Sequence, residues 1–98
     1  MSESLRQTVT ITNPNGFHMR PIEAFIMAAN RYPDCNVTVA KAGKDPANGR
    51  SMLALLELYS PAGTELVIEV SGPRAAAALQ ALVQVFQLNF DEEEQPTR

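Results

Sequence analysis

The chain of 98 residues contains one cysteine, one histidine and no tryptophan. A single cysteine, Cys35, cannot form an internal disulfide, which is typical of the reducing cytoplasm, and we expect it to be an inert, small apolar residue. One histidine without a cysteine pair supplies no ligand cluster, so the sequence predicts neither a metal nor another cofactor. No apolar run has the length of a membrane-spanning helix and no secretory signal opens the chain, so we expect no membrane insertion and a cytoplasmic location.

Positive charge is also scarce, with eight Lys and Arg against eleven Asp and Glu, for a formal net charge of −3. Four of the acidic residues lie consecutively at residues 91–94, so residues 1–90 are balanced. This distribution lacks the basic footprint of a nucleic-acid-binding protein. We therefore predict a single domain over residues 1–90 that binds no nucleic acid, followed by an acidic, disordered tail over residues 91–98.

Hydrophobic periodicity alternates along the chain between the repeat of a strand and that of a helix. Alternation predicts strands at residues 7–12, 37–41 and 64–71, with a short, weak strand in the turn-rich stretch 42–49. Helical spacing predicts helices over about residues 19–31 and 52–58, and a long third helix that begins at Gly72-Pro73, with proline in its first turn. The apolar stripe of this third helix comprises Leu79, Leu82, Val83, Phe86 and Phe90.

The order of these elements and their single apolar faces predict the fold class. A strand with one apolar face fits an antiparallel sheet that is covered on one side, and helices with one apolar stripe form the covering layer. We therefore expect an α/β (α+β) fold of order β-α-β-β-α-β-α. It is an open-faced, two-layer sandwich in which three helices cover one face of a four-stranded antiparallel sheet.

The only histidine lies in the segment 13–21, NPNGFHMRP, after a turn and before the first predicted helix. Gly16 permits a sharp backbone turn, and we expect His18 to be the N-cap residue of the helix. The backbone N–H groups of Met19 and Arg20, with the Arg20 guanidinium, would then face an anion held by the imidazole. The pattern predicts a reversible phosphoryl acceptor, while a purely structural cap is the alternative interpretation.

Two segments resemble a known family. Segment 16–21, GFHMRP, resembles the active-site motif of HPr, the histidine-containing phosphocarrier family of the phosphoenolpyruvate-dependent sugar phosphotransferase system (PTS). Segment 48–53, NGRSML, resembles the part of that family that contains its regulatory serine. The motifs occur in the family's order, and the resemblance extends over about residues 5–90.

The resemblance implies a role for each matching residue. His18 would accept a phosphoryl group at Nδ1 from enzyme I and pass it to enzyme IIA-type acceptors, with Arg20 holding the phosphate. The protein would be a monomeric phosphoryl-transfer intermediate rather than a stand-alone enzyme. Ser51 would be the regulatory site, which HPr kinase/phosphorylase modifies in many bacteria. Met19 and Ile22 are bulkier than the small residues often found at these positions in the family, a difference that would alter partner choice.

The second predicted helix is too short to bury all of its apolar residues beneath one layer. We expect Leu55 and Leu58 to be core residues. The remaining apolar residues would form an exposed patch beside His18 that docks partners: Met52, Leu53 and Leu56.

Three functions therefore remain open from the sequence. The first is a phosphocarrier that acts through His18. The second is a regulatory protein, controlled by phosphorylation of Ser51, that acts on a transcription factor or a kinase. The third is a structural module in which His18 is only a cap.

Overall fold

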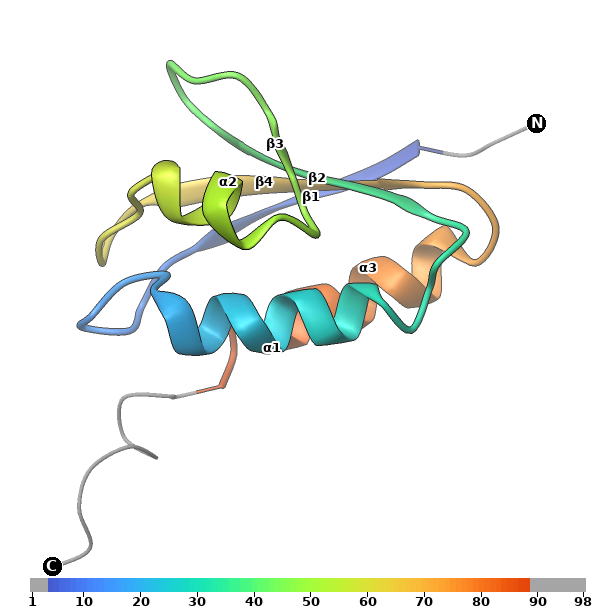
Figure 1. The fold of residues 1–98 in the computed structure, drawn as a ribbon, viewed down its shortest axis with the longest axis horizontal. Helices are drawn as coiled ribbons and strands as arrows, with labels where there is room; N and C mark the ends of the chain where they lie inside the picture. The colour runs from blue at the N-terminus through green and yellow to red at the C-terminus, as the bar shows by residue number, and fades with distance from the viewer. Residues whose placement is uncertain (1–3, 89–98) are drawn as a thin grey trace, which may run out of the picture.

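The computed structural model describes residues 4–88 and shows seven elements within them (Figure 1). In chain order they are β1 (Ser4–Thr10), α1 (Met19–Ala29), β2 (Asn36–Lys41), β3 (Ala47–Asn48), α2 (Met52–Glu57), β4 (Glu65–Ser71) and α3 (Ala75–Val85). The predicted order of strands and helices is confirmed. The proposed tail at residues 91–98 and Phe90 lie outside the described residues.

The strands form one antiparallel sheet in the order β1-β4-β2-β3. The last strand, β4, is central, because it pairs with β1 from Ser4↔Ser71 to Thr10↔Glu65 and with β2 on its other side. Figure 1 shows α1 and α3 running side by side along one face of this sheet. The predicted open-faced sandwich is therefore the observed fold.

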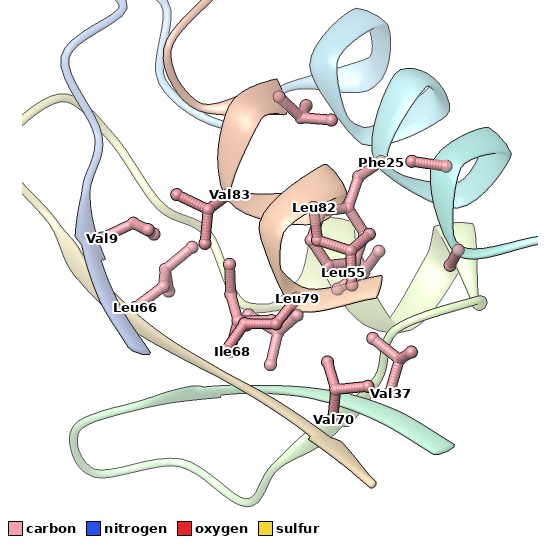
Figure 2. Close-up of a cluster of buried hydrophobic side chains, with 14 of the residues drawn as sticks. Val9, Phe25, Val37, Leu55, Leu66, Ile68, Val70, Leu79, Leu82 and Val83 are labelled. Atoms are coloured by element: carbon pink, nitrogen blue, oxygen red, sulfur yellow. The ribbon is translucent and has the colours of Figure 1, made fainter. Parts of the chain in front are cut away.

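The core lies between the sheet and the helices. Along β4, Leu66, Ile68 and Val70 alternate with partly exposed residues and are completely buried. They meet apolar side chains from every helix, including Phe25 of α1, Leu55 of α2 and Leu82 of α3 (Figure 2). Complete burial of a side chain of this size stabilises the fold by roughly 1.5–3 kcal/mol. Each helix is held to the sheet by this apolar layer.

Two element boundaries differ from the prediction because tertiary bonds set them. Strand β1 spans residues 4–10, not 7–12, since its register against β4 ends at Thr10. Helix α1 ends at Ala29 rather than near Arg31. There the backbone changes to tighter turn bonds, such as Arg31 N–H to Ala28 O at 3.1 Å. The Arg50 guanidinium also donates to Ala29 O at 2.8 Å, which occupies a carbonyl at the helix end.

The predicted start of α3 is wrong. The helix begins at Ala75, and its N-cap Arg74 has a left-handed backbone with φ 61°. Gly72 has φ 117°, and a Cβ there would lie 2.8 Å from Asp34 O, so this turn packs closely on the chain before β2. Cys35 Sγ donates to Pro73 O at 2.9 Å across the same contact. Pro73 therefore belongs to a packed turn that precedes the helix.

The weak third strand is confirmed, with only two residues after Pro46. They pair with β2 as Thr38↔Asn48 and Val39↔Ala47. Within residues 4–88, no helix is long and apolar enough to cross a membrane.

Candidate functional site

The segment before α1 is held to the connection between α2 and β4. Gly16 has φ 78°, and its N–H donates to Asn13 O at 2.9 Å, which closes a tight turn. A Cβ on Gly16 would lie 2.5 Å from Ser60 O and 2.9 Å from the Cα of Pro61. The next N–H, that of Phe17, donates to Ser60 O at 2.8 Å. Glycine is thus required for both the conformation and the close approach.

The Phe17 side chain anchors this segment in the core. It is buried, and its ring lies 5.8 Å from the Phe25 ring in an edge-on arrangement and 4.9 Å from the Phe86 ring. Such aromatic pairs contribute about 0.5–1.5 kcal/mol beyond the area they bury. The residue directly before the histidine is therefore fixed by α1 and α3 together.

His18 is the N-cap residue of α1, as the sequence predicts. Its backbone is extended, and its C=O accepts the first helical hydrogen bond from Ile22 N–H at 2.9 Å. The imidazole makes no capping hydrogen bond to α1, all of whose residues the structure describes. The side chain is half-buried, and its Nε2 atom is shielded from solvent. The support for the helix start comes from the preceding segment, and the imidazole is not used for capping.

A pocket of about 360 Å³ opens beside the imidazole. The preceding turn supplies one wall, and the end of α2 with its following connection supplies the other. The lining residues are Pro14, Asn15, Phe17, His18, Leu56, Tyr59, Ser60 and Pro61. The site is therefore a surface pocket assembled from two distant parts of the chain.

The first turn of α1 places Met19 and Arg20 next to this pocket. Both side chains are exposed, whereas Pro21 and Ile22 are buried. The backbone N–H groups in the first turn of a helix point toward its N-terminal side, and the helix dipole makes that end positive. The arrangement is suited to holding an anion on the imidazole, with a guanidinium two residues away.

Ser51 is the N-cap residue of α2 and uses its side chain differently. Its Oγ accepts a hydrogen bond from Ala54 N–H at 3.1 Å. The preceding Arg50 donates to Cys35 O, Ala29 O and Tyr32 O at 2.7–2.9 Å, and to Asn30 Oδ1 at 3.3 Å. These bonds attach the start of α2 to the C-terminal end of α1, whereas His18 lies at the N-terminal end of that helix.

The apolar residues of α2 divide nearly as predicted. Leu55 and Leu58 are buried, while 66% of Leu53 and 38% of Leu56 are exposed. Met52 departs from the prediction because it is only half-exposed and packs against the core. The exposed apolar surface near the pocket, hereafter the α1–α2 surface, instead comprises Met19, Leu53, Leu56 and Tyr59.

Three residues of the pocket, Tyr59, Ser60 and Pro61, escaped the sequence analysis. Tyr59 is 72% exposed and has a left-handed backbone with φ 52°. It directly follows the C-cap Leu58, a position where helices commonly end in a left-handed residue, usually glycine. That helix end was a usable signal for Tyr59. Nothing in the sequence pattern indicated that Ser60 is buried.

Comparison with known proteins agrees with this geometry. The family model described as the PTS HPr component phosphorylation site matches residues 5–87. The chain belongs to the HPr family.

The chain matches two curated HPr-family relatives over almost their whole length. The phosphocarrier protein HPr of Pseudomonas aeruginosa is 36% identical over 86 residues, which are 88% of this chain and 94% of that protein. The phosphocarrier protein NPr of Klebsiella oxytoca is 34% identical over 90 residues, or 92% and 99%. The crystal structure of HPr from Bacillus anthracis matches with a TM-score of 0.76 and 28% identity, covering 84% of this chain and 95% of that one.

Membership in the HPr family makes this chain a relative of PTS phosphocarriers. Met19 and Ile22, the two residues expected to alter partner choice, differ in their exposure. The Met19 side chain is 60% exposed, whereas Ile22 is completely buried. The effect of these two residues on partner choice stays a prediction, and the buried Ile22 would have to act through packing rather than by contact with a partner. Within residues 4–88, no group of three or more His, Cys, Asp or Glu side chains is arranged to hold a metal ion.

Proposed function

We propose that the protein is a phosphocarrier in which His18 accepts a phosphoryl group from enzyme I and passes it to an enzyme IIA-type acceptor. The observation that carries the proposal is the imidazole at the N-cap of α1, which makes no capping bond to that helix and borders an open pocket. A histidine that only stabilised the helix start would be expected to use its ring for capping. The protein is then a transfer intermediate, acting as a cytoplasmic monomer.

Burial of Nε2 selects the reacting atom. Because Nε2 is shielded from solvent, a donor would have to reach Nδ1 of His18. The Nδ1 lone pair attacks phosphorus, and the bond between phosphorus and the donor atom breaks as the P–Nδ1 bond forms. Transfer to the acceptor reverses these roles, so one geometry serves both half-reactions.

The start of α1 would hold the phosphoryl oxygens. The backbone N–H groups of Met19 and Arg20 lie in the first turn of the helix, and the Arg20 side chain carries a permanent positive charge. Charge-assisted hydrogen bonds from a guanidinium stabilise phosphate strongly. We expect Arg20→Ala to slow phosphoryl acceptance roughly 10–100-fold, in line with the loss of one hydrogen bond from a charged donor.

Partners would dock on the α1–α2 surface. Its four members are exposed apolar side chains, of which Leu56 and Tyr59 line the pocket, and large exposed apolar residues of this kind are typical of protein interaction sites. Flexible methionine and leucine side chains suit contact with several partners in turn. Both the enzyme I donor and the IIA-type acceptor would therefore bind the same face at different times.

The test is phosphoryl transfer from phosphoenolpyruvate through a purified enzyme I to wild type, His18→Ala and His18→Gln. Intact-protein mass reports the added phosphoryl group, and acid treatment distinguishes phosphohistidine, which is labile, from phosphoserine. We expect one acid-labile group on wild type and none on either variant. An acid-stable group on wild type, or a label on His18→Gln, would contradict the proposal.

A regulatory function through Ser51 is the second candidate. Its hydroxyl is at a helix start, where a phosphate is favoured by the helix dipole, and the neighbouring Leu53 is exposed. A phosphate there would disturb apolar docking on the α1–α2 surface. The partners would be HPr kinase/phosphorylase and a transcription factor or kinase. Loss of the cellular role in Ser51→Ala, with His18→Ala unaffected, would favour this function over the carrier.

A further inference from the structure

Ser60 carries a buried hydroxyl that the fold itself does not use. Its side chain is 5% exposed, and no atom of residues 4–88 is placed to form a hydrogen bond with its Oγ. Leaving a buried hydroxyl unsatisfied destabilises a protein, and buried polar groups are paired in the great majority of cases. A buried hydroxyl without a partner therefore indicates a role other than stabilising the fold, and the residues around Ser60 indicate which role.

The hydroxyl belongs to the residue that supports the histidine segment. Ser60 O accepts the Phe17 N–H at 2.8 Å, and the turn at Gly16 is in close contact with the same carbonyl. Ser60 and His18 both line the pocket of about 360 Å³. The Nε2 atom of His18 is buried as well. Two buried polar groups from distant parts of the chain therefore meet at one pocket.

We propose that Ser60 is a positioning residue for the phosphoryl acceptor. The two atoms are not hydrogen-bonded to each other in the structure, and rotation about the Ser60 χ1 angle would direct Oγ to accept a hydrogen bond from Nε2–H of His18. In a neutral imidazole, the bond made by one nitrogen determines which nitrogen carries the proton. Holding the proton on Nε2 leaves the lone pair on Nδ1.

This inference rests on the proposed carrier function and deepens it. The Nδ1 lone pair forms the bond to phosphorus while the bond from phosphorus to the donor atom breaks. The Nε2 proton stays in place throughout, so no proton has to leave or enter the ring. Ser60 touches neither the phosphoryl group nor the donor, and it acts only through the imidazole.

The direct test is the tautomer of His18, measured by ¹⁵N NMR at an alkaline pH where imidazoles are neutral. We expect the Nε2–H form to predominate in wild type, and its ratio to the Nδ1–H form to fall about 3–10-fold in Ser60→Ala, the effect of one hydrogen bond. Ser51→Ala is the matched control, a serine-to-alanine change outside the pocket, and should leave the ratio unchanged. An unchanged ratio in Ser60→Ala would overturn the proposal.

Two further readouts separate this inference from the carrier function. In wild type, the Nε2–H proton should exchange slowly with water, a measurement that does not depend on the variant folding; rapid exchange would contradict the bond. The rate of phosphoryl acceptance from enzyme I should fall about 3–10-fold in Ser60→Ala, in proportion to the tautomer ratio. If wild type accepts no phosphoryl group, the carrier function fails, while the tautomer ratio still tests Ser60.

Discussion

The starts of α1 and α2 are supported in opposite ways. At α2 the side chain of the N-cap residue stabilises the helix start, since Ser51 Oγ accepts a hydrogen bond from Ala54 N–H. At α1 the support comes from the preceding residues, with the Phe17 ring in the core and the turn at Gly16 against Ser60. The helix start therefore does not depend on a capping bond from the His18 imidazole, and modification of that ring would leave the helix start in place. Modification of Ser51, by contrast, would act on a hydroxyl that already stabilises its helix.

The largest expected effect comes from removing the anchor of α1. Phe17→Ala should lower the free energy of unfolding by about 3–5 kcal/mol, because it leaves a cavity between Phe25 and Phe86. Urea unfolding followed by circular dichroism measures the loss. Phosphoryl acceptance by the folded fraction should fall as well, since His18 is no longer held at the pocket.

Ile68→Ala is the control for this prediction, because it removes a completely buried side chain from the central strand β4 and leaves the ring contacts of Phe17 in place. It should destabilise the fold by a similar amount and leave acceptance by the folded fraction close to that of wild type. Equal loss of acceptance in both variants would show that the segment before α1 does not position the histidine.

The next effect concerns the attachment of α2 to α1. Arg50→Ala should destabilise the protein by about 2–3 kcal/mol, because carbonyls at the end of α1 lose a charged donor. Arg50→Lys should recover only part of this loss, since an ammonium lacks the planar fork of a guanidinium. The urea midpoint of each variant measures the effect. Full recovery in the lysine variant would indicate that charge alone, and not the geometry of the fork, holds the helix.

A smaller effect is expected from the cap of α2. Ser51→Ala should cost about 1 kcal/mol through loss of the bond to Ala54 N–H, while Ser51→Asp, which can also cap, should cost less. Neither variant should lose phosphoryl acceptance at His18. His18→Ala should show the reverse, with acceptance lost and the urea midpoint little changed. Similar unfolding free energies for Ser51→Ala and wild type would show that the Ser51 side chain does not stabilise the start of α2.

The smallest effect is expected on the open face of the sheet, away from both helix starts. The Ser4 hydroxyl donates to Glu69, and Arg6 lies 3.5 Å from the same carboxylate. Together they hold the pKa of Glu69 below its ordinary value. The stabilisation is therefore present above the ordinary carboxyl pKa and is lost as pH falls through the lowered one.

Glu69→Gln should abolish this acid-dependent part of the stability and leave the urea midpoint at neutral pH nearly unchanged, because the pair is exposed. Urea unfolding at neutral and at acid pH measures both. A large change in the urea midpoint at neutral pH would contradict the prediction that this exposed group of side chains contributes little to stability.

Local patterns in the sequence were sufficient where the physical cause is itself local. Period-two alternation around Ile68 and helical spacing around Phe25 identified the sheet and its covering layer, because burial of one face requires that spacing. A glycine turn followed by a histidine and an arginine located the candidate site. The serine cap of α2 followed from the same kind of short-range rule.

The sequence failed where a contact between distant segments overrides local preference. Pro73 was predicted inside α3, but its turn packs against Asp34 and Cys35, and the helix begins two residues later. Met52 was predicted to be exposed, but it packs against the core. In both cases the competing contact joins elements that no window along the sequence contains.

The sequence by itself determined the order of the elements, the open-faced fold and the position of His18 at a helix start, because each depends on periodicity or on residues within one turn. Only the tertiary structure decided which atoms surround the imidazole. Tyr59 and Ser60 line the pocket because the connection after α2 packs closely against the turn at Gly16. The Ser60 hydroxyl and the Nε2 atom of His18 are buried because distant segments of the chain pack together, and such packing leaves no periodic signal in the sequence.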